Sequence, residues 1–202
     1  RLAEFATGVD AGPLTFPEPY DDRARADVSE RLASAGLKDY VLLHSAANWY
    51  SKRYPDEAWV EVAAQLHEAS GLPVVWLWGP GERERVQALA GRAGAGQRVS
   101  FPTTLPELAA LVSSARLLVG GDSAPLHLAV ACRTPLVGVF GPTDPAILGP
   151  LDPADGVVRK VLPCSHCHRR VCPLGPREWL AELPPSSIVD AALRRLELNG
   201  TR

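Results

Sequence analysis

The hydrophobic residues of this chain gather in short runs, and the stretches between the runs are polar or amphipathic. Four runs are clear and two are weaker, and together they predict strands at residues 40–44, 74–78, 98–101, 117–119, 136–140 and 156–162. An apolar run without polar alternation is typical of a strand that is covered on both faces, as in a parallel sheet.

The stretches between these runs carry apolar residues at helical spacing. Val28 and Leu32 lie on one face of a charged segment at residues 21–35, and Gly36 is placed to end that helix. Further helices are predicted at residues 56–70, from Leu105 to Val112, and at 186–198. Strands that alternate with helices predict an α/β fold, a parallel sheet with helices on both faces.

The most informative stretch is residues 116–145, in which a Gly-Gly-Asp-Ser turn joins a strand to a helix with Pro125 in its first turn. A helix that starts beyond the carboxyl end of a strand favours phosphate, through its free amides and its dipole. Asp122 cannot attract phosphate but can accept hydrogen bonds from hydroxyls, so a sugar nucleotide would suit this turn. The alternative is an ordinary strand-to-helix corner in which Asp122 and Ser123 only cap the helix.

Two other strand-to-helix loops carry candidate ligand groups. Lys52 follows the first strand, is one of only three lysines in the chain and offers a mobile charge suited to phosphate; Asn48 and Ser51 are weaker candidates for the same role. Glu82 follows the second strand, where a carboxylate can accept both ribose hydroxyls, or can serve only as a favourable charge in the first turn of a helix. The chain has no GxGxxG fingerprint, which lowers the expectation of a nicotinamide or flavin cofactor.

Composition and charge narrow the class of protein. The chain has 202 residues, enough for one α/β domain, and a net charge of −2 with no basic face argues against nucleic acid as a partner. No apolar run approaches the length needed to span a membrane, so a cytoplasmic protein is expected. We expect residues 1–20 to be a linker or the remnant of a preceding domain and residues 21–202 to be the folded domain. The chain lacks methionine and begins with Arg1, so we expect it to be a piece of a longer protein.

A cysteine-rich segment near the end of the chain, PCSHCHRRVCPLG at residues 163–175, leaves two interpretations open. It could hold zinc through a C-x2-C pair, a third cysteine and a histidine, with the ligands Cys164, Cys167, Cys172 and His168. Against this, structural zinc sites usually pair two separated knuckles, and residues packed this tightly in sequence strain tetrahedral geometry. We therefore expect no metal, and in the cytoplasm no disulfide either.

Four segments together resemble one known family. GGDSAPLHLAVACRTPLVGVFGPTDP, HSAANWYSKRYP, WLWGPGERE and CSHCHRRVCPLG are similar, in this order, to motifs of the ADP-heptose:lipopolysaccharide heptosyltransferases, glycosyltransferase family 9. The resemblance implies a Rossmann-like donor-binding domain, the C-terminal half of the two-domain GT-B arrangement. It also implies an inverting enzyme without an essential metal, which transfers heptose from an ADP-heptose to the lipopolysaccharide inner core.

The resemblance also implies roles for single residues. Lys52 would stabilise the departing diphosphate, Glu82 would bind the ribose, Thr104 would border the adenine and Asp122 would position the heptose. His127 matches a family histidine, although a histidine that packs on a neighbouring carbonyl explains it almost as well. Ala124 stands where the family usually has glycine, so a phosphate that approaches this amide must tolerate a methyl group.

The same resemblance places the catalytic base and the lipopolysaccharide acceptor site in a preceding domain, with peripheral contact at the cytoplasmic face of the inner membrane. We therefore expect this chain to bind an ADP-sugar without transferring the sugar. Two alternatives stay open. One is a family 9 enzyme for another sugar nucleotide or glycan, and the other is a non-catalytic nucleotide-binding module whose cysteine-rich segment is structural.

Overall fold

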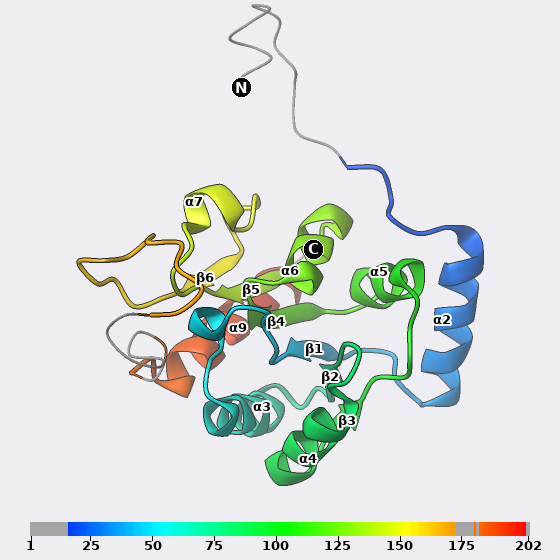
Figure 1. Ribbon diagram of the computed structural model, residues 1–202. Coiled ribbons are helices and arrows are strands. Elements are labelled where there is room, and N and C mark those ends of the chain that lie inside the picture. Colours follow the sequence, from blue (N-terminus) through cyan, green and yellow to red (C-terminus); the bar gives the residue numbers. More distant parts are fainter. Residues whose placement is uncertain (1–15, 173–179, 181, 201–202) are drawn as a thin grey trace, which may run out of the picture.

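The computed structural model describes residues 16–172, 180 and 182–200. Among them, six strands form one parallel sheet in the order β3-β2-β1-β4-β5-β6, the order of a Rossmann fold (Figure 1). The strands are β1 (Val41–His44), β2 (Val74–Leu77), β3 (Gln97–Val99), β4 (Leu117–Gly121), β5 (Leu136–Val139) and β6 (Gly156–Val158). The fold class predicted from the sequence is therefore confirmed.

Helices cover both faces of the sheet (Figure 1). On one face lie α3 (Asp56–Ser70), α4 (Arg83–Ala93) and α9 (Pro185–Gly200). On the other face lie α2 (Asp22–Ser34), α5 (Leu105–Ser113) and α6 (Ala124–Cys132). Two short elements complete the described part, the 3-10 turn η1 (Tyr50–Lys52) and α7 (Pro145–Leu148). Residues 16–20, part of the predicted linker, form no helix or strand, and residues 1–15 lie outside the described residues.

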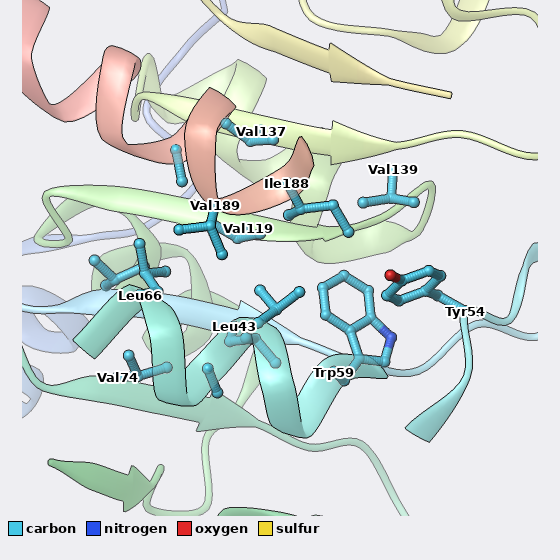
Figure 2. Close-up of a cluster of buried hydrophobic side chains, with 14 of the residues drawn as sticks. Leu43, Tyr54, Trp59, Leu66, Val74, Val119, Val137, Val139, Ile188 and Val189 are labelled. Atoms are coloured by element: carbon cyan, nitrogen blue, oxygen red, sulfur yellow. The ribbon is translucent and has the colours of Figure 1, made fainter. Parts of the chain in front are cut away.

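The two apolar cores follow from the alternation of side chains along each strand. In β1, Val41 and Leu43 point to the core under α3 and α9, whereas Leu42 points to the core under α5 and α6. Figure 2 shows the first core, in which side chains from β1, β4 and β5 gather against Ile188 and Val189 of α9. Because both faces are buried, the central strands are apolar except for His44 at the end of β1, which is why these runs could be found in the sequence.

The loops that carry the predicted site residues meet at the carboxyl ends of the central strands. β1 and β4 are neighbours in the sheet, with His44 paired to Gly120. The chain leaves β1 toward one edge of the sheet and leaves β4 toward the other, so a crevice opens between them, where sheets of this kind bind ligands. None of the described helices has both the length and the apolar character needed to cross a membrane.

Candidate functional site

A cavity of about 520 Å³ lies at this crevice between β1 and β4. Most of the residues that the sequence singled out line it together: Asn48, Lys52, Glu82, Asp122, Ser123, Ala124 and His127. Its apolar wall includes Trp49, Trp78 and Leu108. The cavity therefore joins the loop after β1, the loop after β2 and the start of α6 in one place, as a sugar-nucleotide site requires.

Lys52 reaches the same side of the sheet as the Gly-Gly-Asp-Ser turn. It ends η1, and its Nζ lies 2.6 Å from Asp122 Oδ2 and 4.4 Å from the centroid of the Trp49 ring. The ion pair fixes the direction of the ammonium group, and the ring face adds a cation–π contact. The Lys52 ammonium is thus held at the wall of the cavity, paired with the Asp122 carboxylate.

Asp122 is almost fully buried, and three groups of the protein surround its carboxylate. Besides Lys52, Thr143 donates a hydrogen bond of 2.6 Å to Oδ2, and His127 Nε2 lies 3.4 Å from Oδ1. Burial alone would raise the pKa of Asp122, but the hydrogen bonds from His127, Lys52 and Thr143 together hold it well below its usual value. Asp122 is therefore a carboxylate at neutral pH.

This environment gives Asp122 a role that the sequence did not suggest. The sequence predicts that its carboxylate faces sugar hydroxyls, but the structure turns Oδ2 to Lys52 and Thr143. A charge this deeply buried needs partners, and the protein supplies them itself. In the structure, Asp122 holds Lys52 in place.

Ser123 precedes α6 but does not cap it with its side chain. Its hydroxyl donates a hydrogen bond of 3.0 Å to the carbonyl of Gly121, and His44 Nδ1 lies 3.0 Å from the same hydroxyl oxygen. The backbone amides of Ser123 and Ala124 have no hydrogen-bond acceptor among the described residues. These amides and the positive end of the α6 dipole offer a place for an anion.

Glu82 lies at the start of α4, with its side chain folded back over the loop. Its Oε2 accepts a hydrogen bond of 2.8 Å from the amide of Gly79. Its second carboxylate oxygen has no hydrogen-bond partner within the described ranges. Glu82 is half-buried at the rim of the cavity, where one oxygen stays available for a ligand hydroxyl.

Two predicted site residues have other roles in the structure. Ser51 is almost fully buried and is absent from the cavity wall, because its hydroxyl donates a 2.6 Å hydrogen bond to the carbonyl of Arg169. Thr104 is also absent from the wall, and it caps α5 in a capping box with Glu107. Both hydroxyls are therefore engaged by the protein's own groups.

The alternative interpretation of the cysteine-rich segment as a zinc site is not supported. The described part of the chain holds no group of three or more His, Cys, Asp and Glu side chains arranged to bind a metal ion, and Cys164, Cys167, Cys172 and His168 all lie in that part. Cys172 instead is buried in the core that α9 covers, and Cys164 and Cys167 are partly buried against the same core. The last residues of the segment, 173–175, lie outside the described residues.

Three further residues contribute to the site and were not singled out from the sequence: His44, Trp49 and Thr143. A usable signal existed for Thr143, because the Gly-Pro-Thr-Asp-Pro loop follows β5, next to the turn that carries Asp122. His44 ends an apolar strand, where a polar side chain is uncommon, and this was a second signal.

Comparison with known proteins agrees with the sequence motifs. The family model described as glycosyltransferase family 9 (heptosyltransferase) matches residues 2–177. Lipopolysaccharide heptosyltransferase 1 of Pseudomonas aeruginosa is 33% identical over 172 residues, which are 83% of this chain and 47% of that protein. This chain thus spans about half the length of that relative.

Solved structures show the same fold. A glycosyl transferase family 9 protein of Veillonella parvula superimposes with a TM-score of 0.79 at 22% identity, over 95% of this chain and 56% of the other. An Escherichia coli heptosyltransferase with ADP gives a TM-score of 0.67 at 24% identity, over 95% of this chain and 53% of the other. By its family match, this chain belongs to glycosyltransferase family 9, the heptosyltransferase family.

Proposed function

We propose that this chain binds an ADP-heptose and forms the donor side of a heptosyltransferase that builds the lipopolysaccharide core. The relative from Pseudomonas aeruginosa is a lipopolysaccharide heptosyltransferase, and the Escherichia coli structure was solved with ADP. The single observation that carries the proposal is the position of Lys52, paired with Asp122 at the wall of the cavity that Ser123 and Ala124 also line.

Charge complementarity supports a diphosphate at this place. Lys52 presents its ammonium to the cavity, and the free amides of Ser123 and Ala124 lie at the start of α6. When the bond between the sugar and the diphosphate breaks, negative charge grows on the departing diphosphate. A fixed cation and fixed amides stabilise that charge without reorganisation, which lowers the barrier to transfer.

The other residues of the wall suit the remaining parts of the donor. The available oxygen of Glu82 can accept from ribose hydroxyls, and Trp78 and Leu108 offer apolar surface for the base. The acceptor and the base that deprotonates it belong, on this proposal, to the half of a family 9 enzyme that this chain does not span. The chain is therefore expected to bind the donor without transferring the sugar.

Isothermal titration of the 202-residue chain with ADP tests the proposal. We expect binding, and we expect Lys52→Met to weaken it about ten- to hundredfold, because a hydrogen bond to a charged group contributes about 1.5–3 kcal/mol. Lys38→Met, a change at an exposed lysine away from the cavity, is the matched control and should bind as the unaltered chain does. Absence of binding at millimolar ADP would contradict the proposal.

A further inference from the structure

His44 lines the cavity at the end of β1 and also contacts Ser123. It is the last residue of β1, its side chain is 8% exposed, and its Nδ1 lies 3.0 Å from Ser123 Oγ. Ser123 Oγ lies 3.0 Å from the carbonyl of Gly121, which can only accept, so the Ser123 hydroxyl is the donor in that hydrogen bond. With the hydroxyl proton used there, the contact between His44 and Ser123 requires the tautomer in which Nδ1–H of His44 donates to Ser123 Oγ.

The resulting chain of two hydrogen bonds turns the Ser123 side chain away from α6. A serine directly before a helix ordinarily places its oxygen over the first turn, where it accepts from an amide two or three residues later. Here the hydroxyl is fastened to the end of β4 instead, and Ser123 gives α6 no side-chain cap. The space in front of the first turn of α6 stays open toward the cavity.

We propose that His44 is a positioning residue for the diphosphate of the donor, because it holds the Ser123 hydroxyl against the end of β4 and so keeps the start of α6 free for phosphate. This inference rests on the proposed function. Without the His44 hydrogen bond, the Ser123 side chain is free to rotate over the first turn of α6, into the space in front of the Ser123 and Ala124 amides that phosphate would occupy.

The surroundings of His44 suit this role. Burial lowers its pKa to about 4, while Glu82 acts to raise it and Arg85 to lower it. The ring is therefore neutral at pH 7 and donates through one nitrogen only. A neutral donor can orient a hydroxyl without adding a charge that would disturb the ion pair between Lys52 and Asp122.

Titration with ADP and with adenosine separates this role from a merely structural one. His44→Phe keeps an aromatic ring but removes the donor. We expect it to weaken ADP binding about fivefold, the equivalent of a helix cap of about 1 kcal/mol, and to leave adenosine binding unchanged. His44→Asn, which supplies an amide donor, should restore most of the ADP affinity. His67→Asn is the control, since His67 bonds to the Leu72 carbonyl and does not line the cavity.

A double-mutant cycle with Ser123→Ala gives the decisive comparison. Whatever affinity for ADP this variant has, adding His44→Phe should change it no further, because the hydroxyl to be held is gone. An equal loss with and without the Ser123 hydroxyl, or a parallel loss for ADP and adenosine, would overturn the inference. If the unaltered chain fails to bind ADP, the proposed function is wrong and this inference is wrong with it. If the unaltered chain binds ADP and His44→Phe binds it equally well, only the inference is wrong.

A measurement on the unaltered chain covers the case in which His44→Phe does not fold. Nitrogen-15 NMR of the imidazole reports which ring nitrogen carries the proton. The inference requires the proton on Nδ1, because only that tautomer donates to Ser123. A proton on Nε2 would reverse the hydrogen bond and overturn the inference.

Discussion

Two buried titratable residues of the site, Asp122 and His44, respond to acid in different pH ranges. The pKa of Asp122 is depressed in the folded state, so its contribution to stability is complete above its unfolded pKa of about 4 and is lost only below that. The pKa of His44 falls from 6.5 to about 4 on folding, because burial disfavours the imidazolium. Its contribution is complete above about pH 6.5 and is lost as the pH falls toward 4. Between pH 7.5 and 5, therefore, His44 changes the free energy of unfolding with pH and Asp122 does not.

We predict that His44→Asn removes this acid sensitivity. Between pH 7.5 and 5, the unaltered chain should lose about 2 kcal/mol more of its free energy of unfolding than the variant, from a difference of about 1.36 kcal/mol per pKa unit. Urea unfolding at the two pH values measures both changes. A lower stability of the variant at every pH does not affect the test. The quantity compared is the loss between pH 7.5 and 5 in the unaltered chain and in the variant. Equal losses would show that His44 is not buried as a neutral ring.

At the scale of residues, the sequence predicted which loops carry the site but not how their side chains pair. Lys52 and Asp122 were both singled out, because each follows the carboxyl end of a strand in the same sheet. Their ion pair, and the hydrogen bond from Thr143, join residues that are far apart in the chain. Such pairs depend on the exact approach of three loops, which hydrophobic patterning does not encode.

At the scale of elements, the predictions from periodicity were close. The helix predicted at residues 56–70 is α3 (Asp56–Ser70), and Gly71 ends it in the left-handed conformation. The weak runs were less reliable: the strand predicted at residues 156–162 stops at Val158 in β6. β6 is the last strand in the sheet order, so it pairs on one side only and has less apolar burial to define its end. The turn η1, which is too short to show a periodicity, was not predicted.

The capping box of α5 separates a role in folding from a role in ligand binding. Thr104 Oγ1 accepts a hydrogen bond from the Glu107 amide, and the Glu107 carboxylate accepts one of 2.6 Å from the Thr104 amide. This bond, together with that from the Thr104 hydroxyl, lowers the pKa of Glu107. The resemblance to the family suggested that Thr104 borders the adenine, whereas the structure assigns its side chain to the helix start.

We predict that Thr104→Ala lowers the free energy of unfolding by about 1 kcal/mol, because α5 loses its cap. We expect the affinity for ADP to change less than twofold, since Thr104 does not line the cavity. Urea unfolding and titration with ADP measure the two quantities on the same protein. Thr104→Ser, which keeps the capping oxygen, is the matched control for stability. A loss of ADP affinity in Thr104→Ala would contradict this prediction and show that Thr104 contributes to the donor site.

At the scale of the whole molecule, the described part of the cysteine-rich segment, residues 163–172, forms hydrogen bonds with two loops of the site. The carbonyls of Arg169 and Arg170 accept hydrogen bonds from the hydroxyl and the amide of Ser51, in the turn that carries Lys52. The amide of His168 donates to the carbonyl of Pro142, next to Thr143. One segment thus bonds both to the turn that carries Lys52 and to the loop whose Thr143 bonds to Asp122. This gives the segment a structural purpose that needs no metal.

The hydroxyl of Ser51 makes one of the three hydrogen bonds in this connection, and removal of its oxygen breaks that bond alone. We predict that Ser51→Ala loosens the segment, because the carbonyl of Arg169 loses a partly buried hydrogen bond of about 1 kcal/mol. Cys172, which is 8% exposed, should then react with a thiol reagent about fivefold faster, and ADP should bind several-fold more weakly as Lys52 loses its fixed position.

Peptide mass spectrometry after timed labelling assigns the reaction to Cys172, with Cys132 of α6 as the internal reference within the same molecule. Ser29→Ala, which removes a hydroxyl from the exposed surface of α2, is the matched control and should label as the unaltered chain does. If Ser51→Ala leaves the labelling rate of Cys172 unchanged while ADP binding weakens, Ser51 touches the ligand itself, and the structural role of the segment is wrong. If faster labelling of Cys172 and weaker ADP binding appear together, the cysteine-rich segment stabilises the donor site.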